Sequence, residues 1–453
     1  MMNIFRIFTD IRKGELKQAL QLAVAVFFVL TAYYIVKTLR EPMILASAAE
    51  DTALLNSGVL PSFLQDFLSM KGTYKRVAAA GAQALALMAF VPFFSFLANR
   101  LRRSRLIVAV CFFFLACMIY FGIAMKLSIP FTGFAFYVWV GIFSLAMVAL
   151  FWSYAADIYT EDEGKRLFPF IGIGASLGAI LGSQIADLAF GAQLDDHLIL
   201  AFGGFALIIY LVIILFNNRS ITPKLEALDK EKAGQYSKKG AFYLILANPY
   251  MRYMALMILM LNLVNTTGEY ILSEYIVEHA TAVNQAQNGV NVRDAIGSAY
   301  ASFYFWVNIV SLSLQAFVVS RMAKYGGVRA LLFALPLIAF GVYAFAYMGV
   351  AYMGMRWLKT AENASNYSIM NTVRAMLFLP ASEEEKYKAK QAIDTFFVRI
   401  GDMLAAFGIL YFGATLQFDV QNIALINLSF VALWIIVCVL LYKNYKALQQ
   451  AKE

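Results

Sequence analysis

Apolar stretches long enough to cross a lipid bilayer recur along almost the whole chain. Hydrophobic residues make up 61% of the 453 positions and charged residues only 14%, whereas a soluble domain of ordinary composition carries about 25% charged residues. Each stretch is about 20 residues long, the length of a membrane-crossing helix and roughly twice that of a membrane-barrel strand. The sequence therefore predicts an all-α integral membrane protein in contact with the lipid bilayer.

Twelve such spans can be placed along the chain. Their expected bounds are residues 17–41, 75–98, 105–126, 131–157, 166–190, 197–217, 249–278, 297–320, 328–349, 351–379, 389–416 and 421–442. A polar, lysine-rich stretch separates the sixth span from the seventh. We therefore expect an N-terminal six-helix bundle over 1–217, a cytoplasmic linker over 218–245 and a C-terminal six-helix bundle over 246–453.

Basic residues gather in every second connection between these spans. They lie at the N-terminus, in 100–105, 165–166, 218–240, 321–329 and 386–390, and at the C-terminus. Because cytoplasmic loops carry such an excess of Lys and Arg, the pattern places both termini in the cytoplasm and the protein in a bacterial inner membrane. The same pattern accounts for the net charge of +9 without a nucleic-acid partner.

The two halves of the chain echo each other. FLANRLRRSRLIV (96–108) follows the second span and VVSRMAKYGGVRALLF (318–333) follows the eighth. EDEGKR before IGIGASLGAI (161–180) likewise matches EEEKYKAK (383–390), which precedes VRIGDMLAAF (398–407). Two similar six-helix bundles joined by a cytoplasmic linker are the major facilitator plan, in which the solute site lies between the halves near the midplane.

Ionisable residues occur inside several predicted spans, although each costs about 2.5–3.5 kcal/mol on membrane-insertion scales. Arg40 and Glu41 lie three and four positions after Lys37, so all three share one face of the first span. Arg399 and Asp402 in the eleventh span are also three apart. Two cations and one acid on a single face can hold an anion, and we expect Lys37 and Arg40 to bind the solute.

Further ionisable and aromatic residues have two interpretations each. Glu269 in the seventh span is expected to contact the solute, and Asp157, like Glu41 and Asp402, to act in gating or proton coupling. Lys359 in the tenth span fits equally well with a functional role and with snorkelling to the membrane surface. Three tyrosines lie beside charged positions and are suited either to stacking on a base or to simple packing: Tyr33, Tyr34 and Tyr154.

No pattern for a metal, a cofactor or an enzyme emerges. His197 and His279 fall in predicted external loops, and no nucleophile–base pair or metal-ligand spacing is found. The glycines 174, 178 and 182 recur at every fourth position of the fifth span, which predicts close helix packing rather than a phosphate loop. Residues 46–70 form a long external connection that is expected to hold a short amphipathic segment. We expect a monomer.

Four segments carry a resemblance to the ATP/ADP translocase family, the nucleotide transporters of obligate intracellular bacteria and plastids. The fourth and fifth spans read FWSYAADIYTEDEGKRLFPFIGIGASLGAILGS (151–183), which resembles that family's Phe-Trp step, acidic and basic stretch and Gly-rich helix. FLPASEEEKYKAKQAID (378–394) is similar to its Pro, acidic and Lys-Ala-Ala-Ile-Asp stretch. KTLREPMIL (37–45) and LNLVNTTGEY (261–270) match it in order along the chain.

The resemblance implies an antiporter that exchanges ATP and ADP through a charged central cavity. Matching the motifs makes Lys37 and Lys390 the phosphate-facing cations and Glu269 the acid of the seventh span. Glu163 lies in the acidic stretch after the fourth span, where a gating role is implied. The chain departs from the family at Asp157, where Asn is usual, and at Asp402, where Lys is expected.

Together these features predict a secondary transporter of the major facilitator fold that moves an anionic, phosphorylated solute by alternating access. Lys37, Arg40, Lys390 and Arg399 are the expected anion-binding cations, because guanidinium groups form bidentate phosphate contacts and Lys adds point charge. Two alternatives stay open. One is a proton-coupled exporter of non-nucleotide compounds, and the other is a membrane sensor of the same fold that transports nothing.

Overall fold

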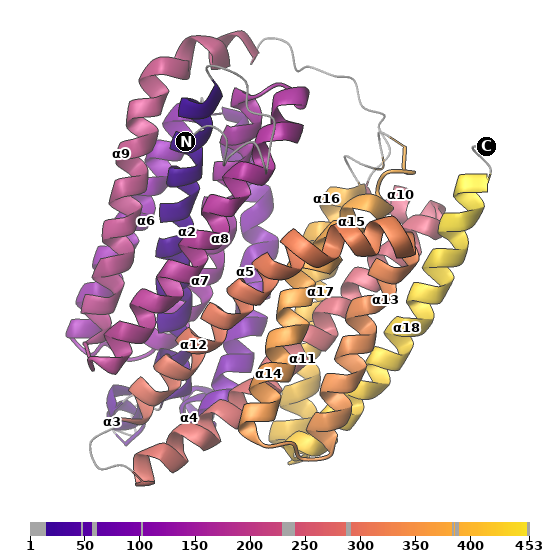
Figure 1. Ribbon diagram of the computed structural model, residues 1–453. Coiled ribbons are helices and arrows are strands. Elements are labelled where there is room, and N and C mark those ends of the chain that lie inside the picture. Colours follow the sequence, from indigo (N-terminus) through magenta and orange to yellow (C-terminus); the bar gives the residue numbers. More distant parts are fainter. Residues whose placement is uncertain are drawn as a thin grey trace. The chain divides into compact units, whose positions relative to one another are not determined.

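The computed structural model describes residues 15–46, 49–56, 61–100, 103–228, 241–286, 291–382, 385 and 389–450 (Figure 1). The predicted basic residues before position 15, the linker segment 229–240 and the loop cations Arg102, Lys386 and Lys388 lie outside the described residues. Every regular element in the described ranges is a helix, so the predicted all-α fold class is confirmed.

Helices are found at every predicted span. In the first half they are α2 (Glu15–Leu45), α5 (Gly72–Arg100), α6 (Arg103–Lys126), α7 (Thr132–Ile158), α8 (Glu161–Gly191) and α9 (Asp196–Leu228). In the second half they are α11 (Pro249–Ala286), α12 (Val292–Ser313), α13 (Val319–Tyr347), α14 (Tyr352–Ser365), α15 (Asn371–Leu377), α16 (Lys390–Ala392), α17 (Val398–Ile409) and α18 (Val420–Gln450).

Shorter elements complete the described chain. They are the helices α3 (Ala49–Asn56), α4 (Ser62–Ser69) and α10 (Ala241–Ala247), and π-helical turns at Leu314–Val318, Asn366–Met370, Ile393–Phe397 and Leu410–Thr415. The two helices α3 and α4 occupy the long connection between the first two spans. The π-turns join helices end to end, so α14 with α15, and α16 with α17, each correspond to one predicted span.

Ten helical stretches among the described residues are long and apolar enough to cross a membrane. One of them, Val292–Tyr347, contains both the eighth and the ninth predicted spans. Gly327 separates the two, because its φ of +59° is not helical. The tenth predicted span is helical but is absent from the ten, since it carries Arg356, Lys359 and Glu362 within a short stretch. The twelve predicted spans are thus consistent with the helices observed.

Two helices extend beyond the predicted apolar spans and correct the placement of the histidines. Helix α11 continues to Ala286 because its polar end contains alanines and no Gly or Pro, so His279 lies on a helix rather than in a loop. His197 likewise lies at the start of α9, one residue after Asp196. The loop position expected for both histidines is therefore wrong. For His279 the reason is that hydropathy marks the apolar length of a helix and not its end.

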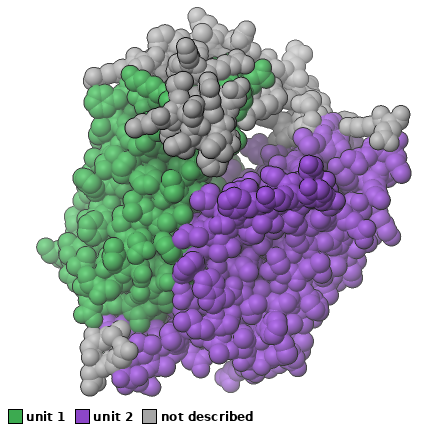
Figure 2. All heavy atoms as spheres, viewed as in Figure 1, with its two compact units in different colours: residues 1–65, 92–234, 293–305 green, residues 66–91, 235–292, 306–453 purple. Residues whose placement is uncertain are grey.

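The chain forms two compact units (Figure 2). Unit 1 contains residues 1–65, 92–234 and 293–305, and unit 2 contains 66–91, 235–292 and 306–453. Unit 1 thus includes the first part of α12, and unit 2 includes most of α5. These two helices hold equivalent places in the repeat, as the second span of each half. The bundle boundaries predicted from the sequence stay a prediction.

Equivalent helices pack together in the two units. In unit 1, α2 contacts α7, α8 and α9, and α6 contacts α9. In unit 2, α11 contacts α17 and α18, and α13 contacts α18. The first helix of each half is therefore the central helix of its unit. This agreement is the structural counterpart of the loop motifs that recur along the sequence.

Close backbone approach holds the central helix of unit 1 in place. A Cβ atom added at Gly174, Gly178 or Gly182 of α8 would lie 2.1–2.5 Å from a main-chain oxygen of α2. The hydroxyl of Thr31 on α2 also donates a hydrogen bond to the carbonyl of Gly178 at 3.2 Å. The predicted packing role of these glycines is confirmed. In unit 2, Gly401 of α17 approaches α11 in the same way, with 2.6 Å from its added Cβ to the carbonyl oxygen of Leu259.

We expect Gly178→Ala to lower the melting temperature by several degrees, because its Cβ would lie 2.1 Å from the carbonyl oxygen of Phe27. Gly172 is a matched control on the same helix, since an added Cβ there meets nothing within 4 Å. Gly172→Ala should leave the melting temperature unchanged or raise it, because Ala favours a helix over Gly by about 1 kcal/mol. Thermal unfolding of the detergent-solubilised protein measures both. Equal melting temperatures would contradict the packing role.

Candidate functional site

The ammonium group of Lys37 lies among three tyrosine rings in unit 1. Lys37 is 7% exposed on α2, and its Nζ is 4.1 Å from the ring centroid of Tyr304, 5.2 Å from that of Tyr34 and 5.8 Å from that of Tyr33. The face of an aromatic ring attracts a cation, more strongly where water is excluded. These rings therefore stabilise a positive charge inside the unit.

Arg40 and Glu41 lie on the same side of α2 as Lys37. The guanidinium of Arg40 stacks over the ring of Tyr137 at 4.4 Å, and its Nε donates to Glu41 Oε1 at 2.9 Å. The hydroxyl of Tyr304 donates to the same carboxylate oxygen at 3.4 Å. The face predicted from the spacing of the three charged residues is thus present, and it is extended by aromatic residues of α7 and α12.

The remaining candidates of unit 1 lie elsewhere. Asp157 is buried in the last turn of α7. Tyr154 is 1% exposed, near enough to Tyr210 for an electrostatic interaction, and this degree of burial favours packing over base stacking. Glu163 forms a capping box with Thr160 at the start of α8, its side chain accepting from the Thr160 backbone N–H at 2.9 Å. That contact gives Glu163 a local structural task at the helix terminus.

Glu269 on α11 lies at the centre of a charged network in unit 2. Its carboxylate accepts a hydrogen bond from Asn363 Nδ2 at 2.9 Å and one from Arg76 Nη2 at 3.5 Å. Lys359 Nζ lies 4.0 Å from Oε1 of the same carboxylate. Arg76 comes from α5, whereas Lys359 and Asn363 come from α14. A single carboxylate therefore joins three helices of the unit.

Lys359 itself is shared between two acids. Its Nζ lies 2.8 Å from Glu362 Oε2 and 3.4 Å from the hydroxyl of Tyr343, which donates to Glu362 at 2.8 Å. Lys359 is fully buried and Glu362 is 3% exposed. Snorkelling of Lys359 to the membrane surface, one of the two interpretations from the sequence, is therefore wrong, because its own helix and α13 enclose the amine.

The two other predicted cations of unit 2 are Arg399, which forms an ion pair of its own, and Lys390. Arg399 Nη1 lies 2.8 Å from Asp402 Oδ2, as their spacing predicts, and Thr266 of α11 donates to the other oxygen of Asp402 at 2.8 Å. Lys390 is exposed on the short helix α16, with its Nζ 5.6 Å from the ring centroid of Phe378. No contact among the described residues joins Lys390 to the network of Glu269.

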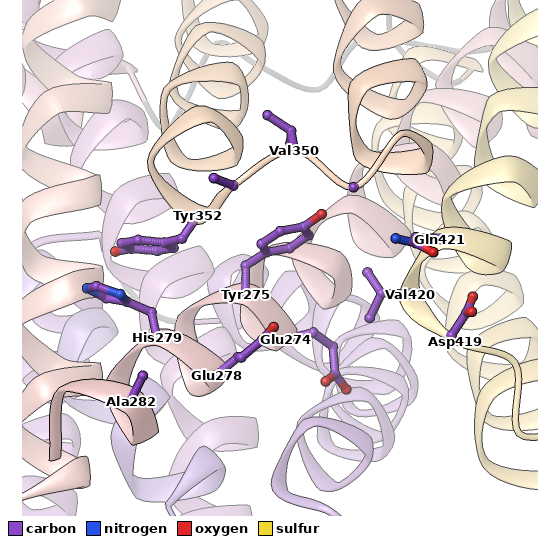
Figure 3. A pocket seen from close by; sticks show the side chains of 12 residues that line it. Glu274, Tyr275, Glu278, His279, Ala282, Val350, Tyr352, Asp419, Val420 and Gln421 are labelled. Carbon is purple, nitrogen blue, oxygen red and sulfur yellow. The ribbon is translucent and has the colours of Figure 1, made fainter. Parts of the chain in front are cut away.

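A cavity of about 610 Å³ opens at one end of unit 2 (Figure 3). Its polar lining includes Glu274 and Glu278 of α11 and Asp419 before α18. His279 stacks on Tyr352 across it, with the ring centroids 4.1 Å apart. Lys71 and Thr73 contact the carboxylate of Glu274. Three acids around one opening disfavour an anion, so this cavity differs in character from the cation-rich groups of α2 and α5.

Sequence reasoning missed the residues that complete both charged groups. Tyr304 and Tyr137 carry no charge and come from other helices, so no pattern along α2 points to them. Arg76 lies at the polar start of α5, and no pattern along the sequence pairs it with Glu269 of α11. The spacing of Lys359 and Glu362, three apart on one helix, was the available signal for their ion pair.

Comparison with protein families identifies two models that match this chain. The Major Facilitator Superfamily model matches residues 22–373. The TLC ATP/ADP transporter model matches residues 339–445. These two matches confirm the family resemblance drawn from the sequence motifs. Both models describe transporters and not enzymes.

Relatives of known function are ADP,ATP carriers. ADP,ATP carrier protein 1 of Chlamydia pneumoniae is 22% identical over 369 residues, covering 70% of this chain and 68% of the relative. The chloroplastic ADP,ATP carrier protein 1 of Arabidopsis thaliana is 21% identical over 358 residues, covering 70% of this chain and 55% of that protein.

Solved structures of similar fold are transporters as well. The nucleoside transporter NupG has a TM-score of 0.59 at 13% identity, covering 95% of this chain and 98% of its own. The POT family transporter PepTSo has a TM-score of 0.63 at 9% identity, with the same coverage. The human organic anion transporter MFSD10 has a TM-score of 0.56 at 16% identity and covers 93% and 99%. These likenesses confirm the predicted major facilitator fold.

We expect Lys359→Met to destabilise the protein strongly. Removing one partner of a buried ion pair costs about 3–5 kcal/mol, because the other charge stays buried, and Glu362 would keep only the hydroxyl of Tyr343. Adding Glu362→Gln to Lys359→Met should restore most of the lost melting temperature. Thermal unfolding in detergent measures the set. A Lys359→Met variant as stable as the original protein would refute the buried pair.

Proposed function

We propose that this chain, which belongs to the major facilitator superfamily, exchanges phosphorylated nucleotides of the ATP and ADP type across a membrane. It is a multi-pass membrane transporter by family and fold. The nucleotide, the exchange mode and alternating access are our proposals. The observation that carries them is the pair Lys37 and Arg40, two cations on one face of α2 in a setting of tyrosine rings.

The chemistry of this pair suits a nucleotide. A buried Lys or Arg inside an apolar helix is costly, and such residues usually mark a solute or ion pathway. Arg40 offers the planar donors that bind phosphate in bidentate fashion, and Lys37 adds a point charge. Tyr33, which is only partly buried, offers a ring face beside those charges, on which a base can stack. We assign phosphate binding to the two cations and base stacking to this ring.

We assign Glu269 and Arg399 of unit 2 to the solute pathway, and Glu41 of unit 1 and Asp402 of unit 2 to gating. Each acid already accepts from a cation: Glu41 from Arg40, and Asp402 from Arg399. These pairs supply the counter-charge that the cations need when no solute is bound. Lys390 and Glu163, implied by the family resemblance, are kept as proposed members of the pathway, as is Asp157 for gating.

Exchange rather than one-way transport follows from the electrostatics. Like charges gathered in a medium of low dielectric constant repel strongly, so a cation-rich pathway resists closing while it is empty. A bound anion removes that penalty, and the transporter changes access mainly when loaded. We place the protein in a bacterial inner membrane with both termini in the cytoplasm, because the positively charged loops alternate with loops poor in cations. We also propose that the protein acts as a monomer.

The test is uptake of labelled ATP and ADP into proteoliposomes with and without nucleotide inside. We expect internal nucleotide to accelerate uptake. Lys37→Met keeps the aliphatic stem but removes the charge, and it should lower the exchange rate about tenfold or more, since a hydrogen bond to a charged group contributes about 1.5–3 kcal/mol. Lys126→Met is a matched control, because Lys126 is exposed at the end of α6, and it should exchange normally.

Uptake that no internal anion accelerates would refute the exchange proposal. Transport that proceeds unchanged in Lys37→Met would instead favour the alternative, a proton-coupled exporter of apolar or cationic compounds.

A further inference from the structure

The charged network of unit 2 has one open end. The side chain of Glu269 is 17% exposed, whereas those of Arg76, Lys359 and Glu362 are 4% exposed or less. A solute that enters this network therefore meets Glu269 first. Arg76, Lys359, Glu362 and Tyr343 form the enclosed end behind it.

The enclosed end is fitted closely against α11. A Cβ atom added at Gly268, one residue before Glu269, would lie 1.9 Å from the hydroxyl oxygen of Tyr343 and 2.8 Å from Nζ of Lys359. A glycine at this position is what allows the amine to lie beside the backbone of α11. The amine is thereby held within 4.0 Å of Glu269 while it is bonded to Glu362.

Within the network, Arg76 and Lys359 contact Glu269, and Lys359 also contacts Glu362. An anion that binds Arg76 must displace Glu269 from it, because an incoming phosphate and the carboxylate compete for the same guanidinium. A displaced carboxylate in this enclosed setting needs another cation. Lys359 is the cation within reach, and Glu362 can release it because the hydroxyl of Tyr343 also donates to Glu362 at 2.8 Å.

We propose that Arg76 is a further anion-binding residue for a phosphate group, and that Lys359 frees it by moving from Glu362 to Glu269. The inference rests on the proposed function, since it takes the solute to be anionic. Arg76 suits the task because a guanidinium forms two parallel hydrogen bonds to phosphate. Lys359 acts as a positioning residue that does not itself touch the solute.

A purely structural ion pair and a mobile one predict different results. If Lys359 and Glu362 only support the fold, neutralising either partner weakens the protein and its ligand binding alike. If Lys359 moves, the two substitutions act in opposite directions. Glu362→Gln lets Lys359 pair with Glu269, so that Glu269 can release Arg76 to the phosphate. Lys359→Met instead leaves Arg76 as the cation that pairs with Glu269.

The experiment measures ATP binding to the full-length protein in detergent by titration calorimetry, at a temperature where every variant is folded. We expect Glu362→Gln to bind ATP about tenfold more tightly than the unaltered protein and Lys359→Met about tenfold more weakly. Arg76→Gln should weaken binding about tenfold or more. Lys71→Met is the matched control, since Lys71 pairs with Glu274 in the same unit, and its affinity should be unchanged.

Weaker binding in both Glu362→Gln and Lys359→Met would overturn the inference and leave the proposed function standing. No ATP binding by the unaltered protein would reject the proposed function and this inference with it. If Glu362→Gln does not fold, Glu362→Asp retains the charge and draws the carboxylate back from Lys359. It should shift affinity in the same direction to a smaller extent, and weaker binding in that variant would also overturn the inference.

Discussion

Every charge inside this apolar helical protein must be compensated by another group of the protein, because the bilayer offers no water to do so. Aromatic rings and carboxylates both meet this constraint. In unit 1, Lys37 lies among tyrosine rings, whose faces attract the ammonium, and Glu41 accepts a hydrogen bond from Arg40. In unit 2, carboxylates compensate the cations directly, with Glu269 and Glu362 on either side of Lys359. The charged groups and the helices that enclose them thus depend on one another.

Pairing with a carboxylate affects how an anionic solute is handled. A cation that is paired with a carboxylate must be released from it before it binds a phosphate. Binding at Arg76 therefore requires the exchange of partners at Glu269. A transporter that contains such pairs can link arrival of the solute to a rearrangement of buried ion pairs. The missing side chain of Gly268 leaves room for the amine of Lys359 beside α11.

The fold was largely predictable from the sequence, and the site only in part. Span positions follow from apolar length, which depends on local composition, and the helices agree with them. The face of Lys37, Arg40 and Glu41 follows from helical spacing, as does the pair of Arg399 and Asp402. Tyr304 could not be foreseen as a partner of Lys37, because only the packing of α12 in unit 1 brings it near. The helical position of His279 could not be predicted for another reason, since a helix continues past its apolar segment wherever no residue ends it.

The central claim is that the buried cations select a phosphorylated solute over an uncharged relative. The most direct measurement compares the shift in melting temperature produced by ATP, by ADP and by adenosine, at low and at high salt. The account predicts that ATP and ADP stabilise the protein, that adenosine does not, and that salt reduces the nucleotide shifts. Stabilisation by adenosine equal to that by ATP, unaffected by salt, would contradict it.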